Sequence, residues 1–132
     1  IVEAFAQGDR KTLRDLLEPK VLAAFESVIT ERENLGHRLG TEIHAVRKME
    51  LCAASCDGNE SVIVIRFIAD ETCVLRDKDN VILSGDPDRI TEMNDIWTFA
   101  RAVKSREPVW LLRETRDGDV SEAHKTPVPD AG

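Results

Sequence analysis

The sequence predicts an α+β domain in which N-terminal helices pack on a curved antiparallel sheet. Up to Gly36, apolar residues recur every three or four positions, as they do on one face of a helix. After Gly36 the apolar pattern has a period of two, which is typical of β-strands. The chain then brings two tryptophans to either side of a proline-containing connection, which indicates a hairpin. Helices first and strands afterwards define the α+β class.

Three helices are expected before Gly36. Residues 1–7 have the pattern of a helix that ends at Gly8. Asp9 can cap a second helix that runs to Leu17, because a carboxylate accepts hydrogen bonds from the free N–H groups of a first turn. Proline is favoured in the first turn of a helix, and Pro19 opens the third one. The residues expected to form the buried stripe of this third helix are Leu22, Phe25, Val28 and Ile29.

Five strands are expected after Gly36. Their ranges are 41–56, 61–69 with a continuation to 75, 81–83, 95–103 and 109–115. The first is long enough to contain a bulge, and the second is apolar on both faces, which indicates a central position in the sheet. A tight connection at 106–108 would join the last two strands. A curved sheet wrapped around the helices would form a cone with an apolar interior.

Composition indicates one domain and excludes some functions. The chain has 132 residues, of which 42% are hydrophobic and 33% charged, as in ordinary globular proteins. Its net charge of −7 argues against a nucleic-acid partner, because such proteins need a basic surface. We expect the domain to cover residues 1–116. Residues 117–132 are rich in Gly, Asp, Ser and Pro and are expected to form a disordered tail.

The cysteines and the N-terminal residues of the sequence give information on the cellular compartment and on membrane attachment. Cys52, Cys56 and Cys73 are an odd number, which favours a reducing compartment and buried thiols that pack as small apolar groups. Only His44 could join them as a metal ligand, so no metal site and no cofactor are expected. The sequence contains no signal peptide or apolar run long enough to span a membrane. It starts at Ile1 within a helical pattern, so we expect an excised fragment whose upstream part could hold an anchor.

Short motifs in the second half of the chain resemble the Tim44-like family. The residues that carry the resemblance are Gly85-Asp86-Pro87, Asp95-x-Trp97-Thr98-Phe99-x-Arg101 and Pro108-x-Trp110. The family includes an inner-membrane subunit of the mitochondrial presequence translocase and bacterial relatives. The resemblance implies a nuclear transport factor 2-like cone with no catalytic activity. It also implies acidic phospholipids such as cardiolipin and inner-membrane proteins as partners, on the bacterial cytoplasmic face or the mitochondrial matrix face. Ala100, Ala102 and Arg113 depart from the family pattern, which weakens the transfer of individual surface contacts.

The resulting hypothesis is a non-enzymatic, membrane-associated docking domain. Its apolar pocket would accept a lipid acyl chain or a partner's hydrophobic side chain, and the expected lining residues are Phe25, Val64, Trp97, Phe99 and Trp110. An early cluster of cations could contact an acidic membrane, and its members are Arg10, Lys11 and Arg14. One alternative is a protein-binding module for a chaperone or membrane-protein complex, without lipid affinity. Another is a small-molecule-binding or catalytic cone that uses Asp95 and His44.

Overall fold

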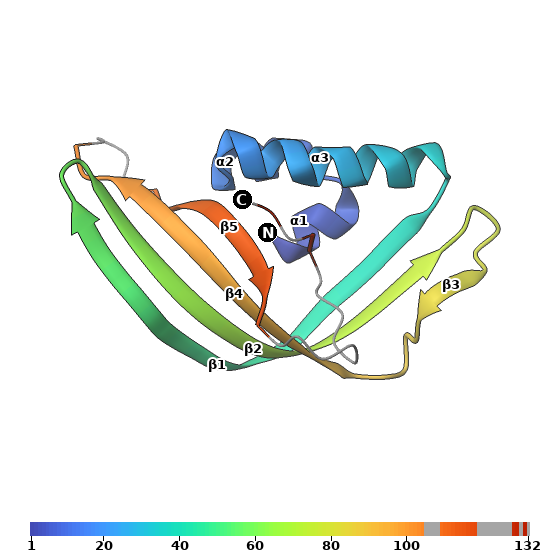
Figure 1. Cartoon of the computed structure of the whole chain (residues 1–132). Helices are drawn as coiled ribbons and strands as arrows, with labels where there is room; N and C mark the ends of the chain where they lie inside the picture. Colours follow the sequence, from blue (N-terminus) through green and yellow to red (C-terminus); the bar gives the residue numbers. More distant parts are fainter. Residues whose placement is uncertain (105–108, 119–127, 130, 132) are drawn as a thin grey trace.

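The computed structural model describes residues 1–104, 109–118, 128–129 and 131. Figure 1 shows a strongly curved sheet with the helices lying across its concave side. The helices are α1 (Val2–Gln7), α2 (Arg10–Leu16) and α3 (Pro19–Asn34). The strands are β1 (Arg38–Asp57), β2 (Glu60–Arg76), β3 (Ile82–Gly85), β4 (Thr91–Ala102) and β5 (Leu111–Asp117). The α+β class with helices on a curved antiparallel sheet is therefore confirmed; the expected connection at 106–108 lies outside the described residues.

The helix boundaries follow from local backbone chemistry. Gly8 ends α1 with φ of 71°, and Gly36 follows α3 with φ of 70°. Both values lie in the left-handed region, where a side chain would clash with the backbone. The Asp9 carboxylate accepts a hydrogen bond of 3.1 Å from the Thr12 backbone N–H and caps α2.

The sheet has the strand order β1-β2-β4-β5. β3 pairs with the last residues of β2, on the same edge of β2 as β4. All pairs are antiparallel. The pairing of β1 with β2 is interrupted by three register shifts, between residues 43 and 45, 46 and 48, and 51 and 53. A shift of this kind adds a residue to one strand and increases its bend and twist. It also resets which β1 residues face the helices.

The main core lies between the helices and the concave side of the sheet. Leu13, Val21, Phe25, Ile29 and Leu112 have no solvent exposure. The buried stripe of α3 therefore differs in part from the expected one. Phe25 and Ile29 belong to it, whereas Val28 is 38% exposed, because it lies at the margin of the face centred on Phe25. Val21 takes its place.

Two further expectations need correction. Cys52 and Cys56 are exposed, because most of β1 lies at the open edge of the sheet, and Cys73 on β2 is half-buried. Of the expected disordered tail, residues 119–127, 130 and 132 lie outside the described residues. Val128, however, is 3% exposed within the core, and Ala131 pairs with Thr115, so these two residues lie against the sheet.

Candidate functional site: the concave face of the sheet

The concave face, defined as the side of the sheet that carries Trp97, extends beyond the area that the helices cover. Residues paired across antiparallel strands share a face. On β2, Phe67 pairs with Met49 of β1. Ile65 pairs with Leu51 of β1 on one side and with Trp97 of β4 on the other. The shifts between residues 43 and 45 and between residues 46 and 48 thus bring a row of apolar residues onto this face: Ile43, Val46, Met49 and Leu51.

Part of this row is open to solvent. Val46 is 56% exposed, Met49 65% and Leu51 62%. In Figure 1, the arm of the sheet formed by the end of β1 and the start of β2 extends past the helices. The neighbouring Ile65 and Phe67 on β2 are only half-buried. The apolar surface therefore continues from the core into an uncovered region at the sheet edge.

Three aromatic rings connect the core to this open region. Phe67 lies edge-on to Trp97, with ring centroids 5.5 Å apart, and its centroid is 6.5 Å from that of Phe99. Trp97 and Phe99 are 6.3 Å apart. Such distances are typical of favourable aromatic pairs. Trp97 is buried, whereas Phe67 and Phe99 are half-buried. The cluster therefore lies at the margin of the core, between the buried residues and the open region.

The structure divides the five residues that were expected to line one pocket between the core, its margin and the convex side of the sheet. Phe25 and Trp97 belong to the buried core, and Phe99 packs against it. Trp110 is half-buried just before β5. Val64 pairs with Thr98, and since successive residues alternate between faces, it lies on the convex side, away from Trp97. The expectation for Val64 is therefore wrong.

The sequence did not point to the exposed row on β1. Its apolar residues are spaced by three, three and two positions, so they do not show the regular alternation of a flat strand. The available signal was the combination of a very long strand with a broken period, which indicates bulges but does not locate them.

A buried polar pair lies on the same face, close to the aromatic cluster. The Trp97 Nε1–H donates to Asp95 Oδ2 at 3.1 Å. Glu71 and Asp95 are each 1% exposed. Burial, and to a smaller extent the charge of Asp95, together raise the pKa of Glu71 to about 7. Asp95 thus orients the tryptophan ring, while burial favours the neutral form of Glu71.

Asp95 and His44 are not brought together. His44 is exposed, and its Nε2 lies 3.0 Å from the Thr72 hydroxyl. Thr72 alternates with Glu71 along β2 and so lies on the convex side, whereas Asp95 lies on the concave side. The structure therefore does not support the alternative of a small-molecule-binding or catalytic cone that uses both residues. Among the described residues, no three His, Cys, Asp or Glu side chains are grouped so that they could hold a metal ion.

The cations expected at a membrane surface differ in their surroundings. The Arg10 guanidinium forms an ion pair with Glu33 at 2.7 Å and donates to the Thr30 hydroxyl at 3.0 Å. This pairing raises the pKa of Arg10 and offsets its charge. Lys11 and Arg14 are exposed.

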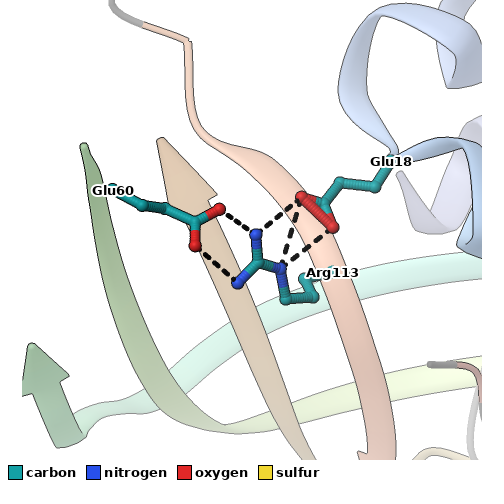
Figure 2. Close-up of polar contacts among 3 residues, drawn as sticks. All are labelled: Glu18, Glu60 and Arg113. Atoms are coloured by element: carbon teal, nitrogen blue, oxygen red, sulfur yellow. Dashed lines mark hydrogen bonds and ion pairs between the residues drawn. The ribbon is translucent and has the colours of Figure 1, made fainter. Parts of the chain in front are cut away.

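A second polar site lies where α3, β2 and β5 meet. Figure 2 shows Arg113 between Glu18, just before α3, and Glu60, at the start of β2. Arg113 Nε donates to Glu18 Oε1 at 3.0 Å, and its other nitrogens contact Glu60. These carboxylates raise the pKa of Arg113, and Arg113 lowers that of Glu60. Glu18 and Glu60 line a cleft of about 600 Å³, which also includes Arg101.

A smaller apolar cavity of about 250 Å³ lies near the end of α3. Its apolar lining consists of Phe5, Val28, Leu35, Leu39 and Leu75. Arg32 contributes a cation to the same cavity, but its Nη2 already donates to the backbone oxygens of Phe5 at 2.8 Å and Ala6 at 3.1 Å. The guanidinium thus ties α3 to the end of α1.

Together, the curved antiparallel sheet, the helices across it and the open apolar face define an α+β domain with a concave apolar surface. The chain belongs to the Tim44-like domain family, whose model matches residues 1–117. The described helices include none that is both long and apolar enough to cross a membrane.

Relatives and solved structures are similar to the chain at low identity. A probable mitochondrial import inner membrane translocase subunit of Caenorhabditis elegans is 25% identical over 117 residues, which are 86% of this chain and 28% of that protein. The mitochondrial import inner membrane translocase subunit TIM44 of Mus musculus is 22% identical over 85% of this chain and 25% of its own length. The chain thus spans about a quarter of these relatives. The intermembrane space region of the chloroplast protein ARC6 has the same fold, with a TM-score of 0.58 at 17% identity, covering 86% of this chain and 82% of that one.

Proposed function

We propose that this domain is a non-catalytic docking module that acts at the surface of an inner membrane. The concave face receives an apolar group, either a lipid acyl chain or a hydrophobic side chain of a partner protein. In this proposal the helices and the sheet together act as a cone whose mouth is the uncovered part of β1. The observation that carries it is the continuous apolar surface from Trp97 through Phe67 to the exposed Met49 and Leu51.

Exposed apolar side chains gathered on one face support docking. Single exposed apolar residues are ordinary, but a contiguous patch marks a surface that binds something. Val46, Met49 and Leu51 form such a patch beside half-buried aromatic rings. Methionine suits this role, because its flexible thioether adapts to partners of different shape.

The relatives supply the proposed location and partner class. Their names identify them as subunits of a mitochondrial import inner membrane translocase. We extend to this domain a peripheral position at an inner membrane and protein partners in a translocase-type complex. Acidic phospholipid is the second proposed ligand. With a net charge of −7, and with Arg10 paired to Glu33, apolar contacts carry the proposed membrane binding more than cations do.

Liposome flotation tests the docking face. Two valines with equal exposure of 56% provide a matched pair: Val46 on the concave face and Val81 next to β3. The chain, Val46→Glu and Val81→Glu are floated with neutral and cardiolipin-rich liposomes at low and high salt. We expect the chain and Val81→Glu to float at both salt concentrations and Val46→Glu to remain unbound. Equal flotation of the two variants would show that the concave face does not dock lipid.

The second candidate function is a protein-binding module without lipid affinity. The apolar row on β1 is interspersed with charged residues, and a polar rim around an apolar centre is typical of protein interfaces. Arg47 contacts Asp70 at 3.4 Å, and Lys48 contacts Glu50 at 3.0 Å. A photo-crosslinking amino acid at Met49, with one at Val81 as the control, distinguishes the two candidates in native membranes. Protein adducts at Met49 alone, together with no flotation, favour this second function.

A further inference from the structure

The outer edge of β5 is occupied by the end of the chain itself. β5 pairs with β4 on one side. On the other side, the Thr115 N–H donates to the Ala131 carbonyl at 2.8 Å, and the Ala131 N–H donates to the Thr115 carbonyl at 3.1 Å. The Thr115 hydroxyl donates to the Pro129 carbonyl at 2.7 Å. Pro129 and Ala131 are thus joined to the edge of the sheet through three hydrogen bonds to Thr115.

The same segment places one apolar side chain in the core. Val128 is 3% exposed and belongs to the cluster that contains Phe25, Trp97 and Leu112. In Figure 1 the dark red end of the chain lies between the helices and the sheet. The contact therefore combines backbone pairing at a sheet edge with one anchored side chain. This combination is the general way in which sheets bind extended peptides.

The edge of β5 and the residues paired with it differ in whether the family model covers them. Thr115, Leu112 and Trp97 lie within residues 1–117, which the family model matches, whereas residues 128–131 lie beyond it. The edge of β5 therefore belongs to the matched domain, whereas the residues paired with it come from outside the matched region.

We infer that the edge of β5 and the core beneath it form a receptor groove for an extended peptide of a partner protein, and that Val128, Pro129 and Ala131 occupy it as an internal competitor. The fitting peptide has a β-branched apolar residue for the Val128 position, followed by proline, since only the carbonyl of Pro129 is used here. A small residue follows at the Ala131 position. This groove is separate from the exposed row on β1, so the inference does not rest on the proposed docking function.

Tethering determines how strongly the internal segment competes. A segment that belongs to the same chain as its binding site competes at an effective concentration on the order of 1 mM. A free peptide that binds the open groove with a Kd of about 10 µM would then bind the intact chain about 100-fold more weakly. Opening the groove should therefore produce a large and measurable gain in peptide affinity.

The experiment uses the full chain and a fluorescein-labelled peptide with the sequence of residues 126–132, TPVPDAG. Val128→Asp with Ala131→Pro opens the groove, because a charge cannot occupy the core and proline has no N–H to donate to Thr115. Val128→Ala is a milder opening that keeps the fold less perturbed. Binding is followed by fluorescence anisotropy, and circular dichroism verifies that each variant is folded. The control peptide TPDPDAG carries aspartate at the anchor position.

We expect peptide affinity to rise from the intact chain to Val128→Ala and again to the double variant, by about 100-fold in total. Thr115→Val on the double variant should weaken binding several-fold, because it removes only the hydroxyl that contacts the Pro129 carbonyl. The control peptide should not bind. Equal affinities for the three chains, or no binding to folded Val128→Ala, would overturn the inference. Liposome binding by the opened chain in place of peptide binding would identify a lipid site and also overturn it.

Discussion

Glu71 is a carboxyl group in a place that water does not reach. It is 1% exposed on the concave side of β2, and the second buried carboxylate, Asp95, acts on it electrostatically. Burial favours the neutral form of an acid, so its pKa of about 7 lies well above the ordinary value of 4.5. In the unfolded chain the group regains its ordinary pKa, and folding is therefore linked to proton uptake.

This linkage predicts a pH-dependent stability that Glu71→Gln removes. Between pH 4.5 and about 7 the folded state keeps a proton that the unfolded state has lost, so the free energy of unfolding falls as pH rises. Above pH 7 the free energy of unfolding should be about 3 kcal/mol lower than it is at low pH. We expect Glu71→Gln to match the unmodified chain at pH 4.5 and to be more stable at pH 8, by urea denaturation. Glu3→Gln, at an exposed position, is the control; the same pH profile in both variants would contradict the assignment.

Arg113 joins three elements through one planar group. Its guanidinium reaches Glu18 and Glu60 at once, and Arg113 and Glu18 are 95 residues apart. The side chain is 36% exposed, so solvent and salt screen these ion pairs. The pKa of Glu60 is lowered, so its contribution is present above the ordinary carboxyl range and is lost as pH falls through the lowered value.

We expect both Arg113→Ala and Arg113→Lys to lower the melting temperature at pH 7. Lysine keeps the charge but lacks the planar fork that donates to two carboxylates, so it should recover only part of the loss. The difference from the unmodified chain should shrink in 1 M salt and at pH 3. Full recovery by lysine would show that charge alone, rather than the bidentate geometry, holds the three elements together.

At the scale of elements, α3 shows how one helix divides between core and surface. Phe25 has no exposure and lies edge-on to Phe5, with ring centroids 5.3 Å apart, whereas Val28 is 38% exposed. Phe25→Ala should reduce the free energy of unfolding by about 3 to 5 kcal/mol, because it leaves a cavity in the core. Val28→Ala should change it by less than about 0.5 kcal/mol. Chemical denaturation measures both, and a comparable loss for Val28→Ala would mean that this residue belongs to the buried stripe.

The sequence was sufficient for the elements, because their signals are local. Gly8, Asp9, Pro19 and Gly36 mark the helix boundaries through backbone conformation and capping, and the structure agrees with each. The face of the sheet on which each strand residue lies was harder to predict from the sequence. Val64 was expected beside Trp97, but register depends on pairing between distant strands, which a single strand does not reveal. For the same reason the exposed residues of β1 were not predicted.

At the scale of the whole molecule, long-range contacts dominate. β1 pairs with β2 along its full length, from Arg38 with Arg76 to Asp57 with Glu60, and Leu17 forms a bridge with Leu112. Closing such loops costs entropy before the contacts form, so folding should take milliseconds to seconds rather than microseconds. Stopped-flow refolding followed by tryptophan fluorescence measures this, with Trp97 as a core reporter. Complete refolding within the dead time would indicate a more local folding nucleus.

The irregular pairing of β1 has a consequence for behaviour at high concentration. A long, flat edge strand with apolar side chains can nucleate edge-to-edge aggregation and amyloid-like stacking. Three register shifts bend β1, so its free edge does not present one straight row of N–H and C=O groups. The chain can thus expose an apolar face, as the proposed docking requires, while its backbone edge remains a poor template for fibre growth.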